Sequence, residues 1–152
     1  MVDEIQEVMG CTCLRIRRAT RRISQIYDQA LAPAGLTVNQ FGLLSHLYGA
    51  SLAGAAGFSI GALAERLGAD PTTLNRTLKP LREKGLARDC LDPGDARVRV
   101  IQLTEKGRRE IVKALPLWRQ AQGRLEKALG AKPIKALNEL LDLSSAKLAH
   151  AR

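Results

Sequence analysis

Apolar residues recur every three or four positions along most of the chain, which is the spacing of amphipathic helices. The first such run extends from Cys11 to about Leu31, and the proline and glycine at Pro33 and Gly35 end it. Later runs with the same spacing predict further helices that begin at Thr37, Ser59, Asp70, Thr104 and Pro133.

Three of these helix starts carry a recognisable capping signal. Thr37 and Gln40 have the T-x-x-Q spacing of a capping box. Ser59 can cap the short helix after it, and Asp70 precedes a proline at the first helical position. Residues 49–57, between two of these helices, are small and are predicted to form a loop.

Two short runs follow the helix that begins at Asp70, and they predict a β-hairpin. The runs are Leu86–Leu91 and Arg97–Leu103, and Asp92-Pro93-Gly94-Asp95 joins them. Proline followed by glycine in the middle of four residues predicts a type II turn. The chain is therefore expected to be mainly α with a small β-hairpin. Its middle part, residues 37–103, is predicted to form a winged helix-turn-helix domain.

The charge balance favours a polyanionic partner. The 152 residues include 24 Lys and Arg against 15 Asp and Glu, which gives a net charge of +9 and a pI near 10. Nucleic acid is the first candidate and an anionic membrane surface the second. Aromatic residues make up only 3% of the chain, which argues against a module that stacks the bases of single strands.

Cysteine and histidine usage excludes several other classes of protein. Three cysteines and two histidines provide neither a disulfide framework nor a metal site, and they suit a reducing compartment. The uncharged stretch of residues 41–64 contains five glycines, so it is not expected to cross a membrane. A cytoplasmic protein is predicted.

The helix after Asp70 has one face suited to duplex DNA. Its leucines lie on one side, and asparagine, arginine, lysine and threonines lie on the other side or its flank. Asparagine pairs with adenine, arginine with guanine, and threonine with either base edges or phosphates. Arginine near the tip of a thin hairpin suits the minor groove. The predicted DNA contacts are Thr72, Thr73, Asn75, Arg76, Lys79, Asp95, Arg97 and Arg99.

Several motifs resemble those of MarR-type transcriptional regulators. Asp95-Ala96-Arg97 followed by Leu103-Thr104-Glu105-Lys106-Gly107 resembles their D-x-R…L-T-x-x-G wing signature. The resemblance continues through Leu63–Leu67 and Leu81–Leu86 and covers about residues 11–148. It implies a homodimer that binds a pseudo-palindromic promoter site, usually as a repressor. It also implies that residues 1–36 and 104–152 form a helical dimerisation region, and that Asp95 holds Arg97 for the minor groove.

The resemblance further implies a switch, operated by thiol oxidation or by a small ligand that is often phenolic. Cys13 and Tyr27 have the spacing of the reactive cysteine and a tyrosine in the organic-hydroperoxide (OhrR-type) branch, although Val38 stands where that branch has a second tyrosine. Cys11 is a second redox candidate. On a helix it would point about 200° away from Cys13, so a disulfide between them requires the first turn to unwind.

The alternative inducer is a small aromatic ligand. In that case the cysteines of the protein would be structural. By position in the family, His46, Tyr48 and Trp118 are the pocket candidates. Two remoter alternatives are a winged-helix module that binds other proteins and a thiol peroxidase that uses Cys11 or Cys13. The chain has no recognisable nucleophile–base pair, phosphate loop or cofactor motif, so no enzyme activity and no cofactor are predicted.

Overall fold

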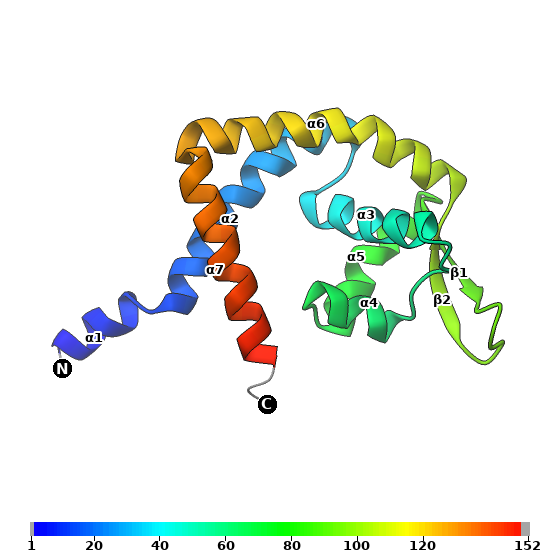
Figure 1. The fold of residues 1–152 in the computed structure, drawn as a ribbon, viewed down its shortest axis with the longest axis horizontal. Coiled ribbons are helices and arrows are strands. Elements are labelled where there is room, and N and C mark those ends of the chain that lie inside the picture. Colours follow the sequence, from blue (N-terminus) through cyan, green and yellow to red (C-terminus); the bar gives the residue numbers. More distant parts are fainter. Residues whose placement is uncertain (1, 150–152) are drawn as a thin grey trace. The chain divides into compact units, whose positions relative to one another are not determined.

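The computed structural model describes residues 2–149 of the chain, and most of them are helical. Two strands, β1 (Ala87–Leu91) and β2 (Arg99–Leu103), form the hairpin between the fifth and sixth α-helices (Figure 1). The helices are α1 (Val2–Met9), α2 (Thr12–Leu31), the 3-10 helix η1 (Ala32–Ala34), α3 (Val38–Leu52), α4 (Ile60–Leu67), α5 (Pro71–Glu83), α6 (Glu105–Leu129) and α7 (Ala131–Ala149).

The chain divides into two compact units. A helical unit combines the residues up to Tyr27 with those from Trp118 onward, and a winged unit spans Asp28–Leu117. The boundaries fall inside α2 and α6, because both long helices contribute residues to each unit. The winged unit is therefore longer at both ends than the DNA-binding domain of residues 37–103 expected from the sequence.

The core of the winged unit consists of leucines from α3, α4 and α5 together with one strand of the hairpin. Leu44, Leu63, Leu78 and Leu81 are fully buried, and Ile101 of β2 is 1% exposed. β1 and β2 pair in antiparallel register, and a single bridge from Phe58 to Ile101 extends the sheet. Burial of these side chains against one another fixes the positions of α5 and the hairpin.

The predicted caps are confirmed. Thr37 and Gln40 form the complete capping box at the start of α3. The Ser59 hydroxyl accepts the N–H of Ala62, and the Asp70 carboxylate accepts the N–H groups of Thr72 and Thr73. Each cap satisfies a backbone donor that has no partner inside its helix, so each helix begins where its signal predicts.

Two sequence-based expectations about local structure are wrong, and one helix was not anticipated. Helix α3 continues through Gly49 to Leu52, so the loop begins at Ala53 and not at Gly49. Helix α1 was not predicted at all. The turn of the hairpin is not type II, because Gly94 lacks the positive φ that this turn requires. The Asp92 carboxylate accepts the N–H groups of Gly94 and Asp95 and sets the turn geometry in its place.

Gly107, in the L-T-x-x-G segment, lies against the backbone before β1. A Cβ at this position would lie 2.1 Å from the Leu86 carbonyl oxygen. Thr104 closes the same junction, because its hydroxyl donates to the Gly85 carbonyl and accepts the Gly107 N–H. The glycine of this motif is therefore explained by close packing of α6 against the chain that enters the hairpin.

Replacing Gly107 by alanine is expected to destabilise the protein by about 1–3 kcal/mol, because the backbone has to move apart. The same change at Gly49 is the matched control. Gly49 lies inside α3, and beyond the backbone of that helix no atom lies within 4 Å of its added Cβ, so Gly49→Ala is expected to be neutral or to stabilise by up to about 1 kcal/mol. Thermal unfolding of both variants measures the difference, and equal melting temperatures would contradict the packing argument.

Candidate nucleic-acid interface

Helix α5 presents a continuous polar surface. Leu74, Leu78 and Leu81 are buried on its inner side. The predicted contact residues Thr72, Thr73, Asn75, Arg76 and Lys79 are all exposed. The helix therefore has the sidedness that its sequence predicts, with hydrogen-bond donors and acceptors turned to solvent.

Two of these side chains have neighbours that modify how they can act. Thr73 lies at the flank of the surface, where it lines a small hollow together with Asn39 of α3. The Lys79 ammonium lies 4.0 Å from the Glu83 carboxylate, and both groups are well exposed. A surface pair of this kind contributes little, so the lysine remains available to a phosphate.

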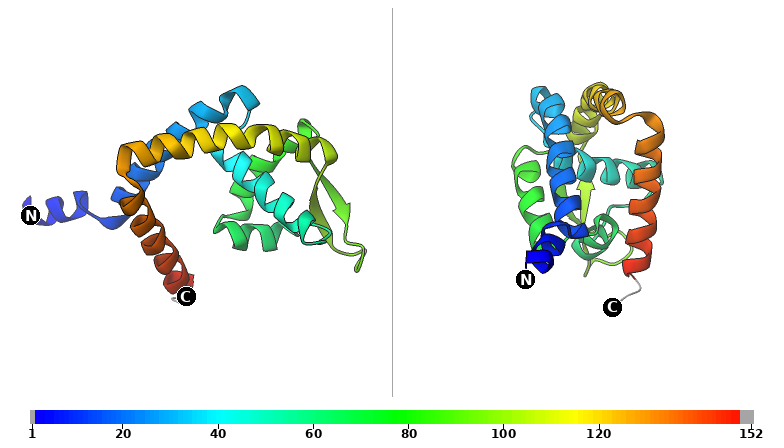
Figure 2. Two further views of the ribbon diagram at one scale, coloured as in Figure 1. Left: turned by 45° about the horizontal axis from the view of Figure 1, so that its top comes forward. Right: turned by 90° about the vertical axis from the view of Figure 1, so that its left-hand side faces the viewer.

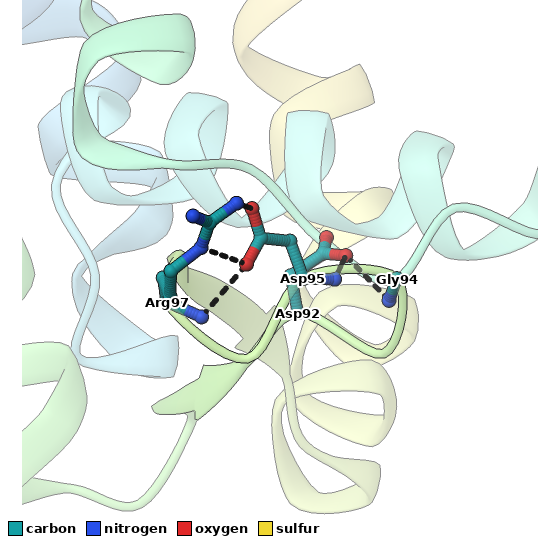
Figure 3. A network of polar contacts seen from close by, with 4 residues as sticks. All are labelled: Asp92, Gly94, Asp95 and Arg97. Atoms are coloured by element: carbon teal, nitrogen blue, oxygen red, sulfur yellow. Dashed lines mark hydrogen bonds and ion pairs between the residues drawn. The ribbon is translucent and has the colours of Figure 1, made fainter.

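The turn of the hairpin holds Arg97 in a fixed geometry (Figure 3). Its Nε and Nη2 donate to the two carboxylate oxygens of Asp95, each at 3.0 Å, and its backbone N–H donates to the same carboxylate. The Arg97 side chain is nevertheless 91% exposed. Paired bonds of this kind orient an arginine without burying it.

The same contacts set the ionisation of the pair. The hydrogen bonds from the side chain and the backbone of Arg97 hold the pKa of Asp95 below its ordinary value, and the carboxylate raises the pKa of Arg97. Arg99, the other predicted wing arginine, is exposed at the start of β2, where it pairs with Leu91 across the hairpin. The wing thus presents one oriented arginine and a second exposed one.

Sequence reasoning missed the role of three basic residues, Arg82 and Lys84 in the motif of Leu81–Leu86 and Lys106 in the L-T-x-x-G segment. Arg82 Nη2 lies 2.7 Å from the Asp89 carboxylate of β1. Lys84 Nζ donates to the carbonyl of Gly35, and Lys106 Nζ donates to the carbonyl of Lys84. These cations join α5 to the hairpin, to the end of η1 and to α6, so they are structural. Pattern alone gave no signal for this, because the partners are mostly backbone carbonyls distant in sequence.

The three redox candidates, Cys11, Cys13 and Tyr27, all belong to the helical unit, but Tyr27 lies far from the two cysteines. Cys11 precedes the first residue of α2, and its sulfur accepts the N–H of Leu14 at 3.4 Å, so it acts as the N-cap. Cys13 is exposed on the first turn. Tyr27 lies on the same helix, about 21 Å further along its axis, so the structure does not bring it near Cys13 within one chain.

Tyr27 instead belongs to a partly buried cluster with α6. Its hydroxyl donates to Gln122 Oε1, and its ring lies 6.4 Å from that of Trp118. Burial, and then the charge of Glu126, raise the pKa of Tyr27. The bond from Tyr27 also gives a partner to Gln122, the one polar residue in a helically spaced series along α6: Ile111, Leu115, Trp118, Gln122, Leu125 and Leu129.

The three predicted ligand-pocket residues have separate surroundings. His46 lines a hollow of about 370 Å³ in the winged unit, and its Nδ1 lies 2.8 Å from the Gly42 carbonyl. Arg66 lines the same hollow and lies over the ring of Phe58. Tyr48 contacts the Arg108 guanidinium, whereas Trp118 belongs to the cluster with Tyr27 in the helical unit.

Among residues 2–149, no group of three or more His, Cys, Asp or Glu side chains could hold a metal ion. In the same part of the chain, no helix is both long and apolar enough to span a bilayer.

A short helix, a capped helix with a polar outer surface, and a hairpin with an oriented arginine follow one another in the winged unit. This arrangement defines a winged helix-turn-helix protein. The family model described as "MarR family" matches residues 34–98. A comparison with curated proteins gives no match.

Solved structures resemble the chain over most of its length. The transcriptional regulator MosR of M. tuberculosis, in complex with DNA, is 39% identical, with 91% of this chain and 97% of that chain covered and a TM-score of 0.74. The repressor CouR bound to a 23-mer DNA duplex is 26% identical, with 91% and 95% covered and a TM-score of 0.75. A mutant MarR from E. coli with operator DNA is 25% identical, with 85% and 89% covered and a TM-score of 0.73.

The chain belongs to the MarR family of winged helix-turn-helix transcriptional regulators. Membership confirms the resemblance noted in the sequence. The narrower assignment to the organic-hydroperoxide branch stays a prediction.

Proposed function

We propose that the protein is a homodimeric regulator that binds a pseudo-palindromic promoter site in duplex DNA and acts as a repressor. The observation that carries this proposal is the combination of the polar surface of α5 with the Asp95-oriented Arg97 on the wing. The polar surface suits the major groove, and an exposed arginine on a thin turn suits the minor groove. The DNA complexes of MosR, CouR and MarR support the proposal.

Within this function the exposed residues have different roles. Asn75 and Arg76 are proposed to contact base edges, because their side chains can form paired hydrogen bonds with adenine and guanine. Lys79 and the threonines are proposed to contact phosphates or base edges, and Arg99 to add to the positive field of the wing. The net charge of +9 also favours association with the negatively charged DNA backbone.

Release from DNA is proposed to follow oxidation of Cys11 and Cys13. The capping bond from Leu14 to the Cys11 sulfur supports this proposal, because a thiol that holds the first turn of α2 couples its chemistry to the fold. A small aromatic ligand is the second candidate inducer, supported by the hollow lined by His46 and Arg66. We also propose that the protein is cytoplasmic and has no enzyme activity.

Replacing Arg76 by alanine tests whether binding is sequence-specific. We expect the variant to lose about 1–3 kcal/mol of binding free energy at the site upstream of its own gene and to relax the base preference there. Binding to a random duplex of equal length should change far less. Fluorescence anisotropy at several salt concentrations measures both affinities.

Arg109→Ala is the matched control, because it also removes one exposed positive charge from the winged unit but lies on α6. It should weaken both duplexes only slightly. An equal loss on specific and random DNA after Arg76→Ala would identify Arg76 as a phosphate contact. If the native protein binds neither duplex in a salt-dependent way, the proposed function is wrong.

A further inference from the structure

An apolar hollow opens beside the outer surface of α5. Helix α5 packs against both α3 and α4 within the winged unit (Figure 2), and the hollow lies where the three helices meet. It has a volume of about 240 Å³. Leu43 and Leu74, which are 1% and 2% exposed, form its floor together with the half-buried Leu67 and Ala69. We call it the α5 hollow.

The α5 hollow is continuous with the surface that we propose for DNA. Exposed Thr73 belongs to both, since it lines the hollow and lies at the flank of the polar surface of α5. Successive residues of a helix are about 100° apart, so Thr73 lies about 60° from Arg76 around the axis, and Thr77 about 40° further on. A helix seated in the major groove would therefore bring base edges to the opening of the hollow.

The lining of the α5 hollow suits an apolar group. Its described lining residues carry no charge, and their polar groups are the Asn39 amide and the hydroxyls of Thr73 and Thr77. The Thr77 hydroxyl donates to the Thr73 carbonyl at 3.2 Å, so it is engaged with the backbone of its own helix. A phosphate would lose its water there without gaining a cation, which is unfavourable. The hollow therefore does not suit the DNA backbone.

The C5-methyl group of a pyrimidine is the apolar group that a base pair presents in the major groove. Thymine carries it, and the other groups there are hydrogen-bond donors and acceptors. 5-Methylcytosine carries the same methyl group at the same ring position. We infer that the α5 hollow receives the C5-methyl group of a pyrimidine and that Thr73 and Thr77 help to select it. The inference rests on the proposed DNA binding and adds an apolar readout to the hydrogen bonds proposed for Asn75 and Arg76.

The size of the hollow agrees with this occupant. A methyl group fills only part of the volume of about 240 Å³, so the adjoining edge of the pyrimidine ring enters with it. Burial of the methyl group against the leucines of the floor removes apolar surface from water, which is favourable. The expected gain in affinity is about three- to tenfold for each methyl group that is read.

Removal of single methyl groups from the DNA tests this inference. In the duplex from upstream of the protein's own gene, each thymine in turn is replaced by deoxyuridine, which lacks only the C5-methyl group. If thymine is read, affinity should fall about three- to tenfold at one position in each half-site and change little elsewhere. In a second series each cytosine in turn carries a C5-methyl group. If 5-methylcytosine is read, affinity should rise by the same factor at one position in each half-site.

Protein variants then locate the methyl group. Ala69→Leu fills the α5 hollow, and we expect it to abolish the difference in affinity between duplexes with and without the methyl group. Ala62→Leu is the matched control and should preserve that difference, because Ala62 is exposed on α4 and lies outside the residues that line the hollow. Circular dichroism checks that both variants fold.

Thr73→Ser is a milder variant, since it removes one methyl group from the lining and keeps the hydroxyl. If the Thr73 side chain contacts the methyl group of the DNA, removing both groups should weaken binding by less than the product of the two separate losses. Fluorescence anisotropy on the same duplexes measures all four affinities.

The outcomes separate this inference from the proposed function. If no single methyl group changes the affinity of a native protein that distinguishes its site from random DNA, the methyl readout is wrong and the proposed function stands. If a methyl group matters equally in the native protein, Ala69→Leu and Thr73→Ser, the hollow is not its site and the inference is wrong. A native protein without salt-dependent binding to DNA would overturn the proposed function and the inference together.

Discussion

Arg97→Ala is expected to weaken binding to the specific duplex by about 10- to 150-fold, the effect of losing one well-placed arginine contact. The guanidinium is already oriented by two bonds to Asp95, so little conformational entropy is lost when it enters a groove. Because a narrow minor groove attracts arginine, the loss should be largest on duplexes with A-tracts beneath the wing. Binding titrations on duplexes that differ only in the base pairs beneath the wing measure this loss of affinity.

Asp95→Ala separates orientation of Arg97 from its charge. The variant keeps the arginine but removes both guanidinium bonds, so we expect a smaller loss than that of Arg97→Ala. Tighter binding after Asp95→Ala would mean that the carboxylate competes with DNA for the guanidinium, and the orienting role would then be wrong. If the Arg97→Ala variant bound every duplex with native affinity, the wing would have no part in the DNA interface.

The pH dependence of this pair follows from the direction of its pKa shift. The pKa of Asp95 is held below its ordinary value, so the carboxylate stays ionised until the pH falls through that lowered pKa. The contribution of the ion pair to wing order is therefore complete at pH 5–8 and is lost only in acid. Titration of Asp95 should therefore cause no change in DNA binding between pH 5 and pH 8.

Much of the winged unit could be predicted from the sequence because its signals are local. A cap such as Thr37 or Asp70 needs only a backbone N–H two or three residues away. The sidedness of α5 follows equally from helical periodicity. Gly107 was marked by a motif, but its close approach to the Leu86 carbonyl depends on a contact between distant segments and became clear only in the structure.

The errors arise where distant or competing contacts decide the outcome. At the hairpin, the Asp92 carboxylate overrides the expectation for Pro93-Gly94. Helix α1 lacks strong start signals, and its apolar residues Ile5, Val8 and Met9 are exposed in the described part of the chain, so its short apolar spacing was missed. The grouping of His46, Tyr48 and Trp118 was taken from family position and stays a prediction, and side chains beside His46 such as Arg66 could not be foreseen from spacing.

Treatment with an organic hydroperoxide is expected to reduce DNA affinity by about 5- to 150-fold, the range of a typical coupling between two sites. The two thiols of Cys11 and Cys13 are oxidised to a disulfide while the hydroperoxide is reduced to the alcohol and water. The Cys11 sulfur then has to leave the Leu14 N–H, and the exposed Cys13 side chain has to turn toward it. Loss of this N-cap leaves the Leu14 N–H without its acceptor and so destabilises the first turn of α2.

Three serine variants distinguish this mechanism from general oxidative damage. Cys13→Ser should bind DNA normally and ignore the peroxide, and Cys11→Ser should do the same because a serine hydroxyl also caps a helix. Cys90→Ser should respond like the native protein, because its sulfur lies beside Gln102 on the hairpin of the winged unit. Anisotropy before oxidation, after it, and after addition of dithiothreitol measures each response. The native protein could instead keep its affinity although mass spectrometry shows the disulfide. That result would mean that thiol oxidation does not cause release from DNA, and it would favour the hollow beside His46 as the inducer site.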